Sequence, residues 1–127
     1  MNMVLTKNFH LMEFASKDGA KFLPDVINNL RELAINLQVL REYVESKISI
    51  TSGYRSEEHN KKVGGAKESF HVKGMAADIK IEGHTPKQVS EIIEHLILTG
   101  RMKQGGLGLY KTWVHYDIRG TKARWNG

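Results

Sequence analysis

Two short segments place a histidine near an aspartate in this chain of 127 residues. In the first, His71 precedes Asp78 by seven positions, and Gly74 lies between them to let the chain turn. In the second, Trp-Val-His-Tyr-Asp-Ile, alternation along a strand places His115 and Asp117 on one face, roughly 6–7 Å apart. From spacing alone, the first segment is equally typical of a loop histidine followed by an exposed aspartate.

Imidazole and carboxylate are the side chains left to hold a transition metal, because the chain contains no cysteine. The same absence excludes thiol catalysis and disulfides. Catalytic zinc sites typically use three protein ligands and leave a fourth position for water. If the strands of Asp78 and His115 pair, these two residues and His71 meet on one sheet face, and we expect a zinc site there. The other histidines are expected at the surface or along helices: His10, His59, His84 and His95.

The composition is that of an ordinary globular protein, with 40% hydrophobic and 26% charged residues, and the length suits one domain over residues 1–127. A net charge of +5 favours a polyanion such as nucleic acid or an anionic cell wall. A nucleic-acid-binding domain would leave the placement of the histidines and aspartates unexplained, so we expect no nucleic-acid partner.

Apolar runs in the chain are too short for the roughly 20 residues that a membrane span needs. Lys7, His10 and Glu13 interrupt the segment where a signal peptide would be apolar. We therefore expect synthesis in the cytoplasm without a signal peptide, no membrane insertion, and action elsewhere only after release or delivery.

Helical and strand periodicities predict the elements that must position these side chains. In chain order they are a helix over residues 25–46, a strand over 47–52, a structured loop over 54–74 with a short helix over 56–62, a strand over 75–81, a helix from Thr85-Pro86 to Gly100, strands over 106–110 and 113–118, and a basic tail or edge segment over 120–127. This order predicts an α+β fold, with a small, mostly antiparallel sheet and helices packed on one face.

Several motifs occur together in order: Ser52-Gly-Tyr-Arg-Ser56, Asn60, Val63-Gly-Gly-Ala66, Ser69-x-His71-x-x-Gly74-x-Ala-Ala-Asp78, Gly105-Gly-x-Gly-x-Tyr110 and Val114-His-x-Asp117. In combination they resemble the zinc D-Ala-D-Ala carboxypeptidase family and its phage endolysin relatives, over roughly residues 27–120. The resemblance implies the fold of the hedgehog signalling domain and zinc-dependent hydrolysis of peptidoglycan stem peptides or cross-links, by a D,D-carboxypeptidase or an L,D-endopeptidase. A phage-type lysin acting as a monomer fits this picture. A non-catalytic zinc-binding module of the same fold, binding wall or protein, is the alternative.

The resemblance also implies residue roles. His71, Asp78 and His115 match the zinc ligands, and Arg55 matches an arginine that contacts the substrate and stabilises the oxyanion. Ser69 matches a position lining the same pocket, and Tyr54, within the same motif as Arg55, is expected to bind the substrate with it.

The catalytic base is the open assignment. Several relatives carry a glutamate or aspartate three residues before the third ligand, where this chain has Thr112. We favour His115 as the ligand and Asp117 as the base. The alternatives are that Asp117 orients a ligand, or that it binds zinc itself while His115 contacts the water.

Other features have plainer interpretations. The glycine pairs Gly64-Gly65 and Gly105-Gly106 are expected in tight turns that shape the pocket. Trp113 is expected either to line the substrate cleft or to pack in the interior. The basic residues near the end of the chain are expected to form a solvated patch: Arg119, Lys122 and Arg124.

Overall fold

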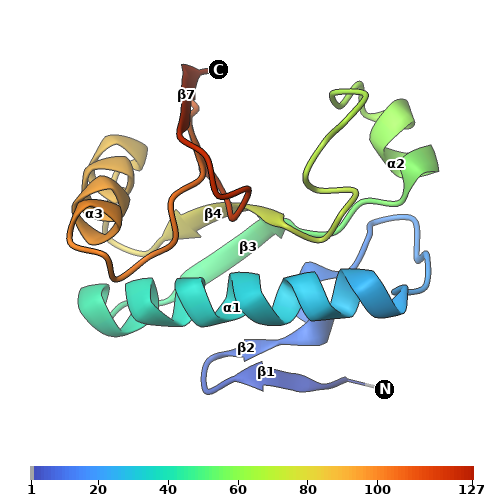
Figure 1. Ribbon diagram of the computed structural model, residues 1–127, viewed down its shortest axis with the longest axis horizontal. Coiled ribbons are helices and arrows are strands. Elements are labelled where there is room, and N and C mark those ends of the chain that lie inside the picture. Colours follow the sequence, from blue (N-terminus) through green and yellow to red (C-terminus); the bar gives the residue numbers. More distant parts are fainter. Residues whose placement is uncertain (1) are drawn as a thin grey trace.

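Three α-helices and two sheets build the computed structural model, which describes residues 2–127 (Figure 1). The helices are α1 (Pro24–Val44), α2 (Glu57–Lys62) and α3 (Pro86–Leu98), with a short 3-10 helix η1 (Leu11–Phe14). The strands are β1 (Val4–Thr6), β2 (Phe9–His10), β3 (Ile48–Ser52), β4 (Ala76–Ile81), β5 (Gly106–Leu109), β6 (Val114–Asp117) and β7 (Ala123–Asn126).

The main sheet has the strand order β3-β4-β6-β5-β7. Its neighbours are antiparallel except β5 and β7, which run parallel. Side chains alternate along β4: Ala77, Ile79 and Ile81 are buried in the hydrophobic core, and Asp78 between them points to the opposite face. The predicted α+β class, with a mostly antiparallel sheet and helices on one face, is confirmed.

The long helix α1 begins at Pro24, whose fixed φ suits a first helical position, and ends where Glu45 adopts a left-handed conformation with φ of 51°. Its buried positions recur at three- and four-residue steps: Val26, Leu30, Leu33, Ala34, Asn36, Leu37 and Leu40. Helix α3 begins with the predicted capping box, because Thr85 Oγ1 accepts from Gln88 N and Gln88 Oε1 accepts from Thr85 N.

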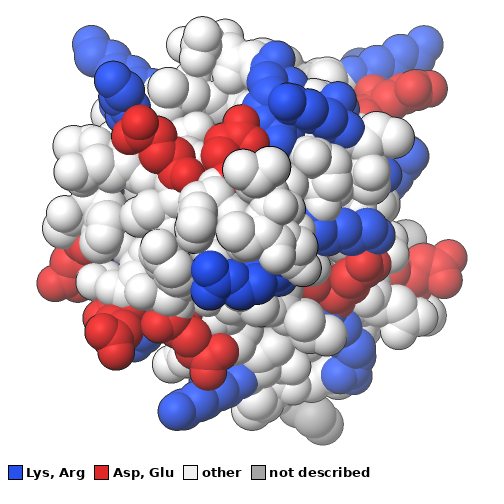
Figure 2. All heavy atoms as spheres, turned by 60° about the vertical axis from the view of Figure 1, so that its left-hand side comes forward, with Lys and Arg blue, Asp and Glu red and all other residues white. Residues whose placement is uncertain are grey.

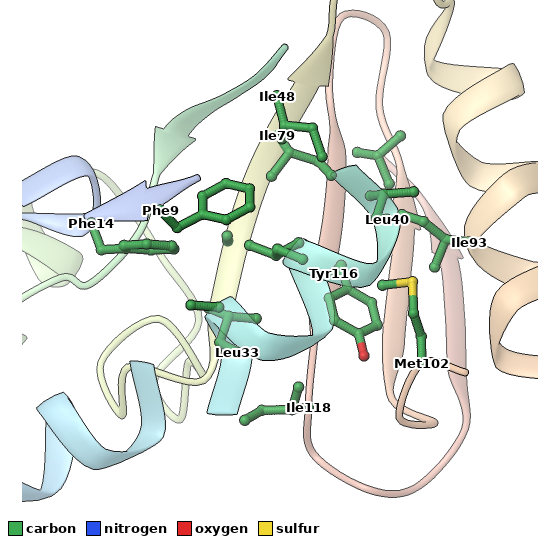
Figure 3. Packing of buried hydrophobic residues seen from close by; sticks show 14 of the residues in the cluster. Phe9, Phe14, Leu33, Leu40, Ile48, Ile79, Ile93, Met102, Tyr116 and Ile118 are labelled. Atoms are coloured by element: carbon green, nitrogen blue, oxygen red, sulfur yellow. The ribbon is translucent and has the colours of Figure 1, made fainter. Parts of the chain in front are cut away.

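One hydrophobic core joins the helices to the main sheet (Figure 3). Leu33 and Leu40 come from α1, and Ile79 and Tyr116 from the sheet. Tyr116 is fully buried, and its hydroxyl donates to the Lys103 carbonyl over 2.7 Å. The core therefore fixes β4 and β6, the two strands whose other faces carry Asp78 and His115.

The N-terminal hairpin of β1 and β2, followed by η1, was not predicted. Phe9 and Phe14 are buried in the core, and the Phe14 carbonyl accepts from the Tyr54 amide over 2.8 Å. Strands of two or three residues are too short to produce a recognisable alternation. The segment supports the end of β3, directly before Arg55.

Charged side chains of both signs are interspersed on the face shown in Figure 2, so the net positive charge forms no single basic field on that face. Within residues 2–127, the helices are too short or too polar to cross a membrane.

Candidate metal centre

Strands β4 and β6 bring Asp78 and His115 together. They pair antiparallel, with Asp78 directly opposite His115 and Ile79 opposite Val114. Because side chains of directly opposed residues project from the same face, the two ligands predicted from separate segments become neighbours. The pairing on which the sequence prediction depended is thus present.

His71 approaches from the turn that precedes β4. Its amide donates to Ser69 Oγ over 3.1 Å, and its carbonyl accepts from the amides of Arg55 and Gly74. Gly74 has a φ of +75°, and a Cβ there would lie 2.8 Å from the Val26 carbonyl. Glycine is therefore required where this turn passes over the start of α1.

The three predicted ligands form one buried group. Asp78 Oδ1 lies 3.3 Å from His71 Nε2 and 3.3 Å from His115 Nδ1. One ligand atom from each residue lies within 4.8 Å of the others, and among residues 2–127 this is the only such group of three or more metal-binding side chains.

The hydrogen bonds of the two imidazoles show what this group would hold. His71 Nδ1 lies 2.8 Å from the Gly53 carbonyl oxygen, which only accepts, so Nδ1 carries the proton. His115 Nε2 lies 2.7 Å from Asp117 Oδ2 and likewise donates. In the neutral imidazoles, the remaining nitrogens then direct lone pairs at the Asp78 carboxylate. Lone pairs that face one another repel, so either additional protons or a metal cation must lie between these atoms. Two nitrogens with one oxygen are a donor set that suits zinc.

Electrostatics at the site favour the charged carboxylate. Burial acts to raise the pKa of Asp78, but its contacts with His115 and His71 outweigh burial and hold that pKa well below its usual value. Burial also acts to lower the pKa of His115, and the contacts with Asp117 and Asp78 reverse this and raise it. Asp78 is thus an anion ready to bind a cation at neutral pH.

Asp117 lies on the far side of the His115 ring from Asp78. It has no solvent exposure. Its Oδ1 accepts from the Gly106 amide at 2.8 Å and from Arg119 Nε at 2.9 Å, and its Oδ2 accepts from His115 and from Arg119 Nη2. Both oxygens are therefore occupied by protein donors. Of the three roles considered for Asp117, this placement suits the orientation of His115.

A cleft of about 560 Å³ opens over the group. Its lining comes from the segments on both sides of α2, from the His71 turn, and from the sheet and the residues next to its strands: Arg55, Val63, Gly64, Gly65, Ala66, Glu68, Ser69, Phe70, His71, Asp78, Tyr110, Trp113, His115, Arg119 and Trp125. A cleft that joins an apolar wall to a few converging polar groups is the usual form of a ligand site.

Arg55 lies in this cleft beside the ligands. Its Nη2 is 3.5 Å from Asp78 Oδ2, Nη1 is 3.3 Å from Asn60 Oδ1, and Nε donates to Ser52 Oγ over 3.1 Å. A Cβ at Gly65 would lie 1.9 Å from Asn60 Oδ1, so this glycine makes room for the Arg55 support.

The other predicted substrate residues differ in placement. Ser69 and Trp113 line the cleft, and Trp113 stacks on Tyr110 with ring centroids 4.7 Å apart. Tyr54, in contrast, is buried in the core, where its ring packs against Phe22. Tyr54 therefore supports the end of β3 and Arg55 rather than lining the cleft.

The predicted solvated patch near the end of the chain was wrong for two of its three members. Arg119 is ion-paired to Asp117, and Arg124 binds both carboxylate oxygens of Glu94 at 2.7 and 2.8 Å. Only Lys122 is exposed. The signal that was missed is alternation, which places Arg119 on the same strand face as Asp117 and His115.

The glycines of the Gly105-Gly-Leu-Gly108 segment also do more than form a turn, because Gly106 and Gly108 lie within β5. A Cβ at Gly106 would meet Asp117 Oδ2 at 2.2 Å, and one at Gly108 would meet the Trp125 indole at 2.5 Å. The missing side chains leave space across the strand for Asp117 and Trp125.

Comparisons with known proteins identify the family. The chain is 32% identical over 106 residues to a Haemophilus influenzae protein named probable peptidoglycan L,D-endopeptidase MepK, covering 78% of this chain and 53% of that protein. The chain thus spans about half the length of the curated relative that it matches. No solved structure gives a significant match. The profile of the family described as Peptidase M15 matches residues 6–117, a segment that includes His71, Asp78 and His115. The chain therefore belongs to the Peptidase M15 family.

Proposed function

We propose that the protein is a zinc-dependent peptidase that hydrolyses peptide bonds in peptidoglycan stem peptides or cross-links. The observation that carries this proposal is the convergence of His71, Asp78 and His115, whose facing atoms are all electron donors when the imidazoles are neutral. Family membership and the name of the Haemophilus relative support the reaction and the substrate class.

His71 Nε2, Asp78 Oδ1 and His115 Nδ1 are the atoms that would hold the metal. Zinc in a three-ligand site supplies a Lewis acid and lowers the pKa of a water ligand toward about 7. Arg55 presents its guanidinium beside Asp78 in the cleft. There it would donate hydrogen bonds to the scissile carbonyl or a substrate carboxylate and stabilise the negative charge that develops.

Two roles remain, the orientation of His115 and the transfer of the proton, and we propose one carboxylate for each. We assign to Asp117 the orientation of His115, since protein donors enclose both of its oxygens. Glu68 is exposed and lines the cleft, where the only other carboxylate among the lining residues is the predicted ligand Asp78. Glu68 would accept the proton released during hydrolysis and return it to the leaving amine.

Within this class we favour an L,D-endopeptidase over a D,D-carboxypeptidase, because the curated relative bears that name. Delivery by a phage lysis or tail apparatus, or release from the cytoplasm, would bring the enzyme to the wall. We propose that it acts there as a monomer.

Digestion of purified peptidoglycan with the zinc-loaded protein, followed by mass analysis of the fragments, tests the reaction. An endopeptidase converts cross-linked dimers into monomers, whereas a carboxypeptidase removes one terminal residue. His71→Ala should abolish cleavage. His84→Ala is the matched control, because His84 lies outside the metal group, and it should cleave like wild type.

Zinc content measured on the same preparations separates the alternatives. Stoichiometric zinc without cleavage of any wall chemotype would favour the non-catalytic zinc module. Absence of stoichiometric zinc in the wild type would contradict the metal centre itself.

A further inference from the structure

Arg119 holds the outer end of a hydrogen-bonded chain that leads to the metal centre. Its Nε and Nη2 donate to the two oxygens of Asp117 over 2.9 and 2.7 Å, and its amide donates to Oδ1 over 3.2 Å. Asp117 in turn accepts from His115 Nε2. A two-point contact of this kind fixes the plane of the carboxylate as well as its position.

Two aromatic rings hold the Arg119 guanidinium in place. Its central carbon lies 4.3 Å from the centre of the Phe70 ring and 5.4 Å from the centre of the Trp125 ring. Phe70 directly precedes the ligand His71, so Arg119 contacts the segments of both histidine ligands. A guanidinium combines planar stacking with a fork of donors, which a lysine does not.

Trp125 makes a second contact with the centre. Its ring lies 4.9 Å from the His115 ring, and its Nε1 donates to the Tyr110 hydroxyl over 2.9 Å. Parallel pairing of β7 with β5 places Trp125 opposite Gly108, where the absence of a side chain leaves space for the indole. The ion pair between Arg124 and Glu94 anchors β7 to α3.

Both Arg119 and Trp125 lie beyond residues 6–117, the segment that matches the family profile. The part of this chain that follows the matched segment therefore contributes to the surroundings of the centre. Arg119 uses Nε and Nη2 on Asp117, so its contact with the centre is made without a substrate.

We propose that Arg119 and Trp125 are positioning residues for the metal centre, which together with Phe70 clamp Asp117 and His115 in the orientation that binds zinc. The clamp also fixes the His71 segment relative to β6, because Phe70 and Arg119 stack. The inference rests on the proposed zinc site. Loss of such supporting contacts typically weakens metal binding about 10–100-fold.

Zinc affinity, measured by competition with a chromophoric chelator, tests the clamp without relying on turnover. Arg119→Gln should weaken zinc binding about 10–100-fold, Arg119→Lys less, and Trp125→Leu several-fold. Arg101→Gln is the matched control, because Arg101 stacks 5.5 Å from the Tyr43 ring away from the cleft. Its zinc affinity should equal that of wild type.

Two further measurements separate positioning from folding. The visible spectrum of the cobalt-substituted protein reports ligand geometry, and it should change in the Arg119 and Trp125 variants but not in Arg101→Gln. Arg119→Gln leaves the buried Asp117 charge without its cation, so the double variant Asp117→Asn/Arg119→Gln, which removes both charges, is compared with Asp117→Asn. The double variant should bind zinc more weakly than Asp117→Asn alone.

Wild-type zinc affinity and cobalt spectrum in folded Arg119→Lys and Trp125→Leu would overturn the clamp while leaving the proposed function intact. An increased KM at unchanged zinc affinity would also overturn it, since Arg119 would then act on the substrate. A wild-type protein that binds no zinc would instead contradict the proposed function.

Discussion

The carboxylates of Glu68 and Asp117 lie in opposite surroundings. Glu68 is exposed along the cleft, whereas Asp117 has no exposure and is bonded on both oxygens. Burial acts to raise the pKa of Asp117, but the contacts with His115, Arg119 and the Gly106 amide outweigh it and hold the pKa well below its usual value. A carboxylate so stabilised as an anion is a poor proton acceptor but a firm anchor for His115.

Glu68→Gln should therefore lower kcat by about 10²–10⁴-fold, the usual contribution of a general base, while zinc affinity stays at the wild-type value. Steady-state hydrolysis of a purified muropeptide and chelator competition provide the two measurements. Glu57→Gln, an exposed glutamate at the start of α2, is the matched control. Unchanged kcat in Glu68→Gln would place the base elsewhere.

Asp117→Asn should give the opposite pattern. The amide oxygen still accepts from His115, but the negative charge that strengthens this ligand is lost, so zinc affinity should fall about 10–100-fold. Excess zinc should then restore much of the activity. If saturating zinc restored none, Asp117 would have a direct part in the chemistry, as the sequence first indicated.

At this scale the sequence motifs indicate which residues meet. His71, Asp78 and His115 lie together in the structure, as the motifs and the strand alternation predict, and their role as metal ligands stays a prediction. Asp117 was assigned from its strand face alone, and a face does not reveal which side of the neighbouring ring a carboxylate occupies. Of the donors that enclose it, the Gly106 amide is brought there by the pairing of β5 with β6, and Arg119 follows Asp117 by two residues.

At the scale of elements, β7 forms part of the wall of the cleft, because it carries Trp125. Its residues carry neither a helical nor a clear strand periodicity, so the sequence predicts either a basic tail or an edge segment. The structure shows an edge strand, held by Arg124 and by parallel pairing with β5. Strand partners of this kind depend on the whole sheet, which explains why a local pattern did not reveal them.

Gly108→Ala tests how closely β7 packs across β5. The added Cβ would lie 2.5 Å from the Trp125 indole, so the variant should lose about 1–3 kcal/mol of unfolding free energy. Trp125→Ala removes the obstructing ring, and in that background the same glycine change should cost much less. Denaturant unfolding of the four proteins gives the coupling, and additive effects would contradict the packing.

A second element-scale contact links the loop before α1 to the start of α2. Asp18 accepts hydrogen bonds from the hydroxyls of Ser16 and Ser56, and Ser56 caps α2. These bonds, first that of Ser16 and then that of Ser56, lower the pKa of Asp18 from 3.8 to about 2. Because the folded pKa is lowered, the stability from Asp18 is present above pH 3.8 and is lost as the pH falls toward 2.

Asp18→Asn should consequently lower the Tm relative to wild type at pH 6, and the difference should shrink as the pH falls from about 4 to about 2. Thermal unfolding followed by circular dichroism across this range measures the difference directly. Asp25→Asn, an exposed aspartate of α1, controls for the loss of one surface charge. A Tm difference that stays constant with pH would show that folding does not lower the pKa of Asp18.

At the scale of the whole molecule, a single hydrophobic core supports the candidate metal centre. The helices cover the apolar face of the sheet, and the polar face carries the predicted ligands, so hydrophobic patterning indicates both the class of fold and the face on which these side chains lie. The N-terminal hairpin and η1 escaped prediction because Phe9 and Phe14 obtain their burial from distant partners rather than from local periodicity.

Metal binding should stabilise this whole unit, since His71 precedes β4 and the other two ligands lie on β4 and β6. Zinc at 100 times its Kd would add about 2.7 kcal/mol, which corresponds to a rise in Tm of roughly 10 °C for a domain of this size. Scanning calorimetry with zinc and then with excess chelator should show a reversible shift. His71→Ala should show a much smaller one.

The thiol-free donor set of the centre has a consequence for handling the protein. Two imidazoles and a carboxylate follow the general order of divalent affinities, in which copper exceeds nickel, and both compete well with zinc. Protein eluted from a nickel affinity column will therefore carry nickel in part of its molecules. Elemental analysis of such material would report metal acquired during purification, and stripping followed by defined reloading should yield a homogeneous metal-loaded protein.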